Sequence, residues 1–275
     1  MKLINCLDEL QLTKSEIKIL EFIETNYDDF LFMSIIELAE ELEISEATIS
    51  RFVRKIGADD FKSLKTLVLD KSPYMAAEKM KTTLASSEDL NLDSYLSKQI
   101  ENIKKTLDHI DTKQFDQACK LIAQKNKIYI YAKHAGKSLA TLMYTRLNRI
   151  GIDPWILPSG GTEFVESLSK LAQDDLLIVF SFSKISREDK IIFDYKKDVK
   201  FKVIQFTSRL YHDKDKAGDL NLFVYRGERN EYHSLTVAVA LVDAMIVKVT
   251  ELKGEKSLER LEKIKELKNS YKDFK

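Results

Sequence analysis

Apolar residues in the first part of the chain recur at helical spacing behind three polar start signals. Thr13 with Glu16 and Ser34 with Glu37 form Ser/Thr-x-x-Glu pairs, and Ser45 precedes a third apolar series. Such a hydroxyl begins a helix because its oxygen accepts a hydrogen bond from a backbone N–H that the first turn leaves free. The apolar positions behind the three signals are Ile17, Ile19, Leu20, Phe22 and Ile23, then Ile35, Leu38, Ala39 and Leu42, then Ile49, Phe52, Val53 and Ile56. This pattern predicts three short helices, the last ending at Gly57.

The chain beyond these helices is polar and helical as far as Asn126. Leu96, Ile100, Ile103 and Leu107 form a continuous apolar stripe along one predicted helix there. Together with apolar stripes on the C-terminal helices, this stripe supplies more apolar surface than is needed to cover one face of a sheet. The excess predicts a homodimer or a dimer of dimers formed through residues after 90.

After Asn126 the pattern changes to short β-branched and aromatic runs that alternate with helical segments. The predicted strands are 128–131, 154–157, 176–180, 201–206 and 220–224, and the predicted helices are 136–150, 161–173, 187–197 and 232–253. Strands that alternate with crossover helices form a parallel sheet covered on both faces. The fold class is therefore α/β, with a doubly wound parallel five-stranded sheet behind an all-α N-terminal part.

Residues 34–57 have the organisation of a helix-turn-helix. Two helices meet across the very short turn Glu43-Ile44, and Ala39 is small where they touch. A major groove admits one α-helix, whose N-terminal residues reach the base edges. The candidate base contacts are Ser45, Glu46, Thr48 and Arg51, and the candidate phosphate contacts are Arg54, Lys55, Lys62 and Lys65.

The charge of the chain limits this interpretation. With 44 basic and 44 acidic residues the formal net charge is zero, so any DNA site must be a local patch. Between residues 48 and 71, six basic residues stand against three acidic ones, whereas the preceding helices are acidic. Charge alone does not separate a DNA-reading helix from an ordinary helical hairpin with a solvated basic face.

The cysteines and apolar stretches indicate the compartment. Cys6 and Cys119 are the only cysteines and lie far apart in the sequence, which predicts neither a disulfide framework nor a zinc site and favours a reducing cytoplasm. Residues 1–12 contain two acidic side chains, unlike a signal peptide, and the apolar stretch 237–249 is short and interrupted by charge. We expect a cytoplasmic protein with no membrane partner, no metal and no cofactor.

Four segments together resemble the RpiR family of transcriptional regulators. They are Leu12-Thr-Lys-Ser-Glu16, Ser34-Ile-Ile-Glu-Leu-Ala39, Ser45-Glu-Ala-Thr-Ile-Ser-Arg-Phe-Val-Arg-Lys-Ile-Gly57 and Phe61-Lys-Ser-Leu-Lys65. The resemblance covers nearly the whole chain, because the predicted strand order also fits the family's SIS (sugar isomerase) domain, which binds phosphosugars. It implies a DNA-binding domain over 1–75, a helical linker over 76–90 and a SIS-like sensing domain over 91–275.

The loop after the third predicted strand is the best candidate for holding an anion. Ser181-Phe-Ser-Lys-Ile-Ser-Arg-Glu188 resembles the SIS loop Ser-x-Ser-Gly-x-Thr, with hydroxyls at Ser181, Ser183 and Ser186. Lys184 replaces the usual glycine, and its side chain either adds charge to the site or blocks it. Phosphate favours such hydroxyls beside the free N–H groups of a helix N-terminus. The alternative is that these serines only cap helices.

The first strand-to-helix loop departs further from the family. Aligning on Arg149-Ile-Gly151 places Ala132-Lys-His-Ala-Gly136 where the family has Gly-x-Gly-x-Ser, so that Gly136 and Ser138 remain as candidates. Thr207 follows the fourth strand and resembles a residue of the family's Thr-rich loop. We expect these three residues to share the ligand site with the serine loop.

The sequence therefore predicts a DNA-binding transcriptional regulator, not an enzyme, that responds to a phosphosugar or a related anionic metabolite. A helix-turn-helix reads only a short half-site, so the double-stranded DNA operator is expected to be palindromic. Two alternatives remain open. One is a phosphosugar isomerase, for which Glu228, Glu231 and His233 supply candidate acid–base groups. The other is a regulator whose SIS domain binds no ligand and only dimerises.

Overall fold

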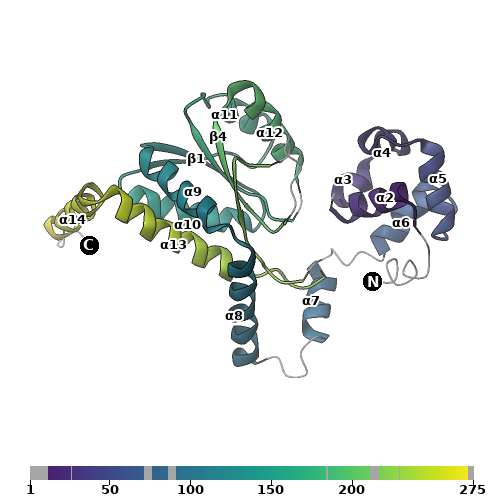
Figure 1. Cartoon of the computed structure of the whole chain (residues 1–275), viewed down its shortest axis with the longest axis horizontal. Coiled ribbons are helices and arrows are strands. Elements are labelled where there is room, and N and C mark those ends of the chain that lie inside the picture. The colour runs from purple at the N-terminus through teal and green to yellow at the C-terminus, as the bar shows by residue number, and fades with distance from the viewer. Residues whose placement is uncertain are drawn as a thin grey trace. The chain divides into compact units, whose positions relative to one another are not determined.

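The computed structural model describes residues 12–25, 27–70, 76–85, 91–183, 185–210, 217–228 and 230–271. The chain divides into two compact units (Figure 1). The first contains residues up to Leu90 together with Gly227–His233, and the second contains Asn91–Arg226 and Ser234–Lys275.

The first unit is helical. Its elements are α2 (Lys14–Thr25), α3 (Tyr27–Phe32), α4 (Ile35–Leu42), α5 (Glu46–Lys55), α6 (Phe61–Asp70) and α7 (Ala76–Ala85). Both predicted capping pairs are confirmed: Thr13 N–H donates to Glu16 Oε2 over 2.7 Å, and Ser34 N–H donates to Glu37 Oε2 over 2.6 Å. The predicted apolar face of α2 is wrong at Ile17, which is exposed because Ile19, Phe22 and Ile23 turn toward the core instead.

The turn between α4 and α5 has the geometry that a helix-turn-helix requires. Glu43 ends α4 in the left-handed conformation at φ 53°, and Ile44 N–H donates to Ala39 O over 3.0 Å. Ala39 is buried there, as its small side chain predicts. Gly57 has φ 83° after α5, so Ala58 N–H can donate back to Val53 O over 3.0 Å. The predicted helix-turn-helix is confirmed.

The second unit is built on a five-stranded sheet whose strands all run parallel, in the order β2-β1-β3-β4-β5. The strands are β1 (Lys127–Ala132), β2 (Asp153–Ile156), β3 (Leu176–Phe180), β4 (Lys202–Thr207) and β5 (Leu220–Phe223). The chain moves from β1 outward to β2 and then returns to β3 on the other side of β1. This reversal makes the sheet doubly wound, as predicted. Open α/β sheets bind ligands at such a reversal, and the position between the loops that follow β1 and β3 is called the crevice below.

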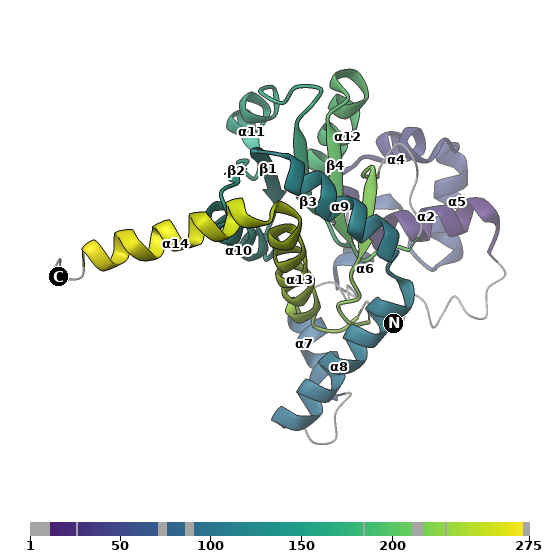
Figure 2. The ribbon, with the colours of Figure 1, turned by 60° about the vertical axis from the view of Figure 1, so that its left-hand side comes forward.

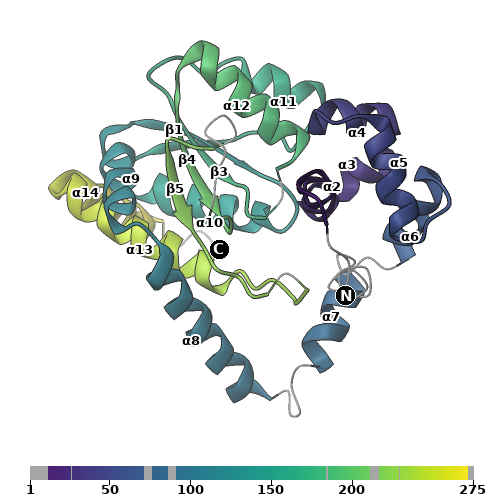
Figure 3. The same cartoon turned by 45° about the vertical axis from the view of Figure 1, so that its right-hand side comes forward.

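Helices cover both faces of the sheet (Figure 3). Helices α9 (Thr112–Gln124), α10 (Gly136–Arg149) and α13 (Thr236–Lys253) pack on one face, and α11 (Gly161–Leu168) and α12 (Arg187–Val199) pack on the other. Alternate residues of β1, β3 and β4 supply the two cores, and every residue of β3 is buried. Such burial on both faces is typical of a central parallel strand.

Two predicted helices have different ends. The helix predicted over 161–173 ends at Leu168, because Asp175 accepts a hydrogen bond from Ala172 N–H over 2.8 Å and forms the turn into β3. The helix predicted over 232–253 begins only at Thr236, whose N–H donates to Ser234 Oγ over 3.1 Å.

Two further helices flank the sheet domain. The buried positions of α8 (Leu92–His109) are Gln99, Asn102 and Thr106. Its predicted apolar stripe stays at the surface instead, with Leu96, Ile100 and Leu107 about half exposed or more. Helix α14 (Glu255–Ser270) extends away from the sheet (Figure 2), and the Ser257 hydroxyl at its first turn donates to Ile150 O over 3.3 Å. None of the helices in the described part of the chain is long and apolar enough to cross a membrane.

Candidate functional site

Helix α5 carries the predicted base contacts on one exposed face. The Ser45 hydroxyl accepts a hydrogen bond from Thr48 N–H over 3.2 Å and lies 2.9 Å from the Thr48 hydroxyl. Arg51 Nη2 donates to Thr48 Oγ1 over 3.3 Å, and Glu46 is exposed in the first turn. The hydroxyls in the first turn of α5 therefore hold the Arg51 side chain in place. Because this side chain samples fewer rotamers before binding, it loses less conformational entropy on binding.

The predicted phosphate contacts differ in how far their side chains are already engaged within the domain. Arg54 and Lys62 are exposed, and the Lys65 ammonium lies 5.3 Å from the centre of the Phe61 ring. Lys55 is committed within the domain, because its ammonium pairs with the buried carboxylate of Glu16 over 2.8 Å. Burial alone raises the pKa of Glu16, but hydrogen bonds from Lys55 and Thr13 outweigh it and hold the pKa below its ordinary value. Lys55 therefore ties α5 to α2.

The predicted ligand residues come together at the carboxyl ends of β1, β3 and β4, three adjacent strands. Gly136 is buried at the start of α10, where an added Cβ would lie 3.4 Å from Ala132 Cβ. Ser138 is exposed and its hydroxyl donates to Ala135 O over 2.7 Å. The Thr207 hydroxyl is buried, donates to Phe182 O over 3.2 Å and accepts from Arg209 N–H over 3.2 Å. Packing and local hydrogen bonds thus already use all three.

The serine loop closes around a carboxylate of the chain itself. Asp189 is buried on α12, and its Oδ2 accepts hydrogen bonds from the Ser181 hydroxyl and from Ser186 N–H, both over 2.8 Å. The Ser186 hydroxyl in turn accepts from Asp189 N–H over 3.1 Å. Ser183 is exposed, and Lys184 lies outside the described residues. Two donors that would hold a bound anion therefore already hold Asp189.

An ion pair joins the loop after β1 to the first turn of α12. Lys133 Nζ lies 2.6 Å from Glu188 Oε2, and both side chains are mostly buried. Burial by itself raises the pKa of Glu188, but the hydrogen bond and charge of Lys133 hold it below the ordinary value. A Cβ at Gly160 would meet Glu188 Oε1 at 2.8 Å, so the glycine makes room for this pair.

Two arginines that sequence reasoning missed lie beside this crevice. Arg209 and Arg226 follow β4 and β5, and each lies next to a hydroxyl residue of the Thr207-Ser208 pair. Arg209 Nη2 and Asp189 Oδ1 are both buried and have no hydrogen-bond partner among the described residues. One sequence signal could have found the arginines, because each stands two or three residues beyond a predicted strand whose carboxyl end faces the crevice.

The acid–base candidates of the isomerase alternative lie elsewhere. Glu228, Glu231 and His233 belong to the segment that groups with the first unit. There His233 Nε2 lies 3.1 Å from Glu228 O, and His233 Nδ1 lies 3.4 Å from Lys79 Nζ on α7. Tyr232 N–H donates to Thr83 Oγ1 over 2.8 Å, which fixes this segment against α7.

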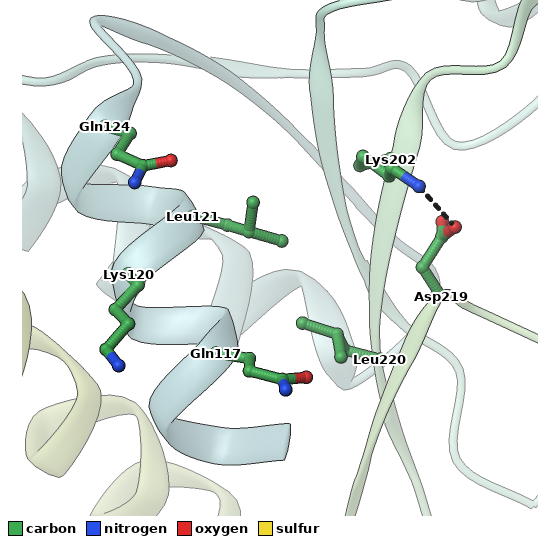
Figure 4. A pocket seen from close by; sticks show the side chains of 7 residues that line it. All are labelled: Gln117, Lys120, Leu121, Gln124, Lys202, Asp219 and Leu220. Carbon is green, nitrogen blue, oxygen red and sulfur yellow. Dashed lines mark hydrogen bonds and ion pairs between the residues drawn. The ribbon is translucent and has the colours of Figure 1, made fainter. Parts of the chain in front are cut away.

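An open hollow lies at the opposite end of the sheet, between α9 and the starts of β4 and β5 (Figure 4). Leu121 and Leu220 form its floor, and Lys202 pairs with Asp219 over 3.3 Å at its rim. None of the predicted ligand residues lines this hollow.

Known proteins are similar to this chain in both of its units. Residues 3–72 match the family model of the helix-turn-helix domain of the rpiR family. An uncharacterized HTH-type transcriptional regulator of Haemophilus influenzae is 28% identical over 186 residues, which are 64% of this chain and 63% of that protein. The matching region thus spans less than two thirds of this relative.

Solved structures share the fold. The sugar isomerase domain of the RpiR transcription factor from Sphaerobacter thermophilus aligns with 62% of this chain and 96% of its own, at 18% identity and a TM-score of 0.57. The NanR protein of Vibrio vulnificus, complexed with ManNAc-6P, aligns with 98% of this chain and 97% of its own, at 20% identity and a TM-score of 0.61. The C-terminal unit therefore has the fold of a sugar isomerase domain, as the sequence predicted.

Proposed function

We propose that the protein is a DNA-binding transcriptional regulator, because residues 3–72 match the family model of the rpiR helix-turn-helix domain. The observation that carries the proposal is the exposed face of α5, where Ser45 and Thr48 hold Arg51 in place. An arginine held on the exposed face of a recognition helix can donate two hydrogen bonds to one guanine. Exposed Arg54 and Lys62 supply the phosphate contacts.

The test compares Arg51→Ala with Lys62→Ala after operator selection from a random-sequence library. Arg51→Ala should lose about 1–3 kcal/mol of specific binding and relax the preference at one base pair. Lys62→Ala should weaken binding to all sequences alike and reduce the salt dependence by about one ion. Fluorescence anisotropy on selected and scrambled duplexes measures both. If Arg51→Ala selects the same sequences as the wild type, α5 does not read the operator in this way.

We further infer that the C-terminal domain senses a phosphorylated sugar or a similar anion at the carboxyl ends of its strands. The crevice lies at the point where the strand order reverses, which is where open α/β sheets bind ligands. The NanR protein that shares this fold was solved with ManNAc-6P, which supports a phosphosugar as the ligand class. A ligand that binds the folded state alone raises apparent stability, so a thermal-shift screen of sugar phosphates tests this inference.

We favour regulation without catalysis, in a cytoplasmic protein. Of the acid–base candidates, His233 is engaged on both ring nitrogens, with the backbone carbonyl of Glu228 and with Lys79 of α7. The Ser181 and Ser186 donors already bind Asp189. This observation is also compatible with the second alternative, a domain that binds no ligand and only dimerises. A direct assay for sugar-phosphate turnover separates the isomerase from the regulator.

A further inference from the structure

Three loops that follow adjacent strands bring two arginines to the Thr207-Ser208 pair, and one of the arginines lies over an aromatic ring. Phe182 follows β3, Arg209 follows β4 and Arg226 follows β5. The Arg226 guanidinium carbon lies 4.0 Å from the centre of the Phe182 ring, and Arg226 Nε donates to Ser208 Oγ over 3.4 Å. Arg209 Nε donates to Thr207 Oγ1 over 3.4 Å. The neighbouring hydroxyls and the ring thus fix the planes of both guanidinium groups.

The charge of Arg226 has no counter-ion within the described part of the chain. Its contacts there are the Ser208 hydroxyl and the Phe182 ring, and no carboxylate forms an ion pair with it. Burial lowers the pKa of Arg226 to about 10, so the side chain remains charged at neutral pH. Arg226 is partly buried, and a charge that is withdrawn from water in a protein is usually paired.

A second pair of unsatisfied groups stands beside this charge. Arg209 Nη2 and Asp189 Oδ1 belong to groups of opposite charge, and both atoms are buried without a hydrogen-bond partner in the part of the chain that the structure describes. Asp189 lowers the cost of keeping Arg209 charged, yet the two atoms form no salt bridge. A hydroxyl group placed between them could accept from Arg209 and donate to Asp189, and so satisfy both.

We propose that Arg226 and Arg209 form the anion-binding part of the sensor site, while Asp189 takes the place of the anion in the serine loop. The ligand is a hydroxylated phosphate ester: its phosphate pairs with the Arg226 guanidinium, and a hydroxyl bridges Arg209 and Asp189. A planar guanidinium suits phosphate because it donates two parallel hydrogen bonds. This inference rests on the proposed sensing function and concerns where the anion binds.

The test measures binding of inorganic phosphate and of glucose 6-phosphate to the full chain, by ³¹P line broadening and by thermal shift. The variants are Arg226→Met, which keeps an apolar stem over Phe182, and Arg149→Met, which removes an exposed arginine at the other end of α10. Arg149→Met should bind both probes as the wild type does. Arg226→Met should weaken both about tenfold or more.

Arg209→Gln tests the hydroxyl bridge and does not depend on the stability of Arg226→Met. It should reduce the preference for glucose 6-phosphate over inorganic phosphate and leave phosphate binding largely intact. A Ser183→Ala and Ser186→Ala double variant should retain phosphate binding, since Asp189 already occupies that loop.

Two results overturn the arginine site. If Arg226→Met binds phosphate like the wild type and the double serine variant does not, the anion lies in the serine loop, and the sensing proposal stands. If the wild type binds neither probe, the arginine site is wrong. In that case, a sugar-phosphate panel that leaves DNA affinity unchanged would also remove the sensing function.

Discussion

At the scale of single residues, the Glu16 carboxylate decides what Lys55 can do. Lys55 looks like a phosphate contact in the sequence, but its ammonium lies 2.8 Å from a buried carboxylate on α2. Arg54, the next residue back, is exposed. Lys55→Met should therefore lower the stability of the domain, whereas Arg54→Met should mainly reduce the salt dependence of DNA binding.

The Glu16–Lys55 pair makes a pH-dependent prediction. Because the folded-state pKa of Glu16 is lowered, its contribution to stability is present above the ordinary glutamate range and is lost as the pH falls through the folded-state value. Glu16→Gln should cost about 1 kcal/mol of unfolding free energy at pH 7 and nothing in strong acid. Urea unfolding at several pH values measures this. Glu40→Gln, at an exposed position of α4, is the control, and an equal loss there would contradict the argument.

The raised pKa of Asp189 predicts the opposite dependence of stability on pH. Burial raises its pKa more than the hydrogen bonds from Ser186 and Ser181 and the charge of Arg209 lower it. A carboxyl group with a raised folded-state pKa takes up its proton more readily in the folded state, so the wild type gains stability as the pH falls toward that value. Asp189→Asn lacks this gain. The unfolding free energy of the wild type relative to Asp189→Asn should rise as the pH falls from neutral through the raised folded-state pKa toward the ordinary aspartate range. A fall would show that Asp189 stabilises the fold as an ion.

At the scale of elements, the polar face of α8 protects the free edge of the sheet. Strand β5 has a sheet neighbour only in β4, and the Thr106 hydroxyl of α8 accepts a hydrogen bond from Tyr225 N–H over 3.0 Å just beyond its end. Gln114 of α9 accepts from Asn221 N–H over 2.7 Å. Edge strands expose N–H groups that invite pairing with another chain, and here helix side chains occupy two of them.

This arrangement predicts the effect of Thr106→Val. Valine has nearly the shape of threonine but leaves Tyr225 N–H without its acceptor, which should cost about 1–3 kcal/mol of unfolding free energy. Thr66→Val, on the exposed surface of α6, should change the free energy little. Chemical denaturation measures both variants. A loss at Thr106 no larger than at Thr66 would mean that water replaces the hydroxyl at this edge.

At the scale of the whole molecule, the exposed apolar side chains predict self-association. Leu96, Ile100 and Leu107 line α8, and Val247 of α13 is 71% exposed. Side chains of this kind on several helices of one unit indicate a surface that a partner covers. We predict a homodimer that presents two copies of α5 to a palindromic operator. The centres of the two half-sites should lie about one turn of DNA apart.

The dimer is tested by light scattering at micromolar concentration, with and without operator DNA. Val247→Lys should shift the protein toward the monomer and weaken operator binding, because each monomer then reads only one half-site. Val165→Lys, at an exposed apolar position of α11 on the other face of the sheet, is the matched control and should remain dimeric. A monomeric wild type would contradict the prediction.

The sequence by itself determined the features that depend on neighbours within a few residues. The capping pairs at Thr13 and Ser34 are hydrogen bonds between residues three apart, so their geometry follows from helix formation alone. The short β-branched and aromatic runs between helical segments likewise predicted the five-stranded sheet, because strands that alternate with crossover helices pair in parallel. The predicted burial of Ile17 is wrong because helical spacing does not say which edge of a wide apolar face meets the core.

Only the tertiary structure decided which distant residues meet. Lys55 finds Glu16 across 39 positions, Thr106 meets Tyr225 across 119, and Arg209 comes beside Asp189 through the pairing of β3 with β4. Each of these charged or polar groups has many partners of similar energy in the sequence. The choice is made by how the helices and strands pack, since burial removes the water that would otherwise satisfy every one of them.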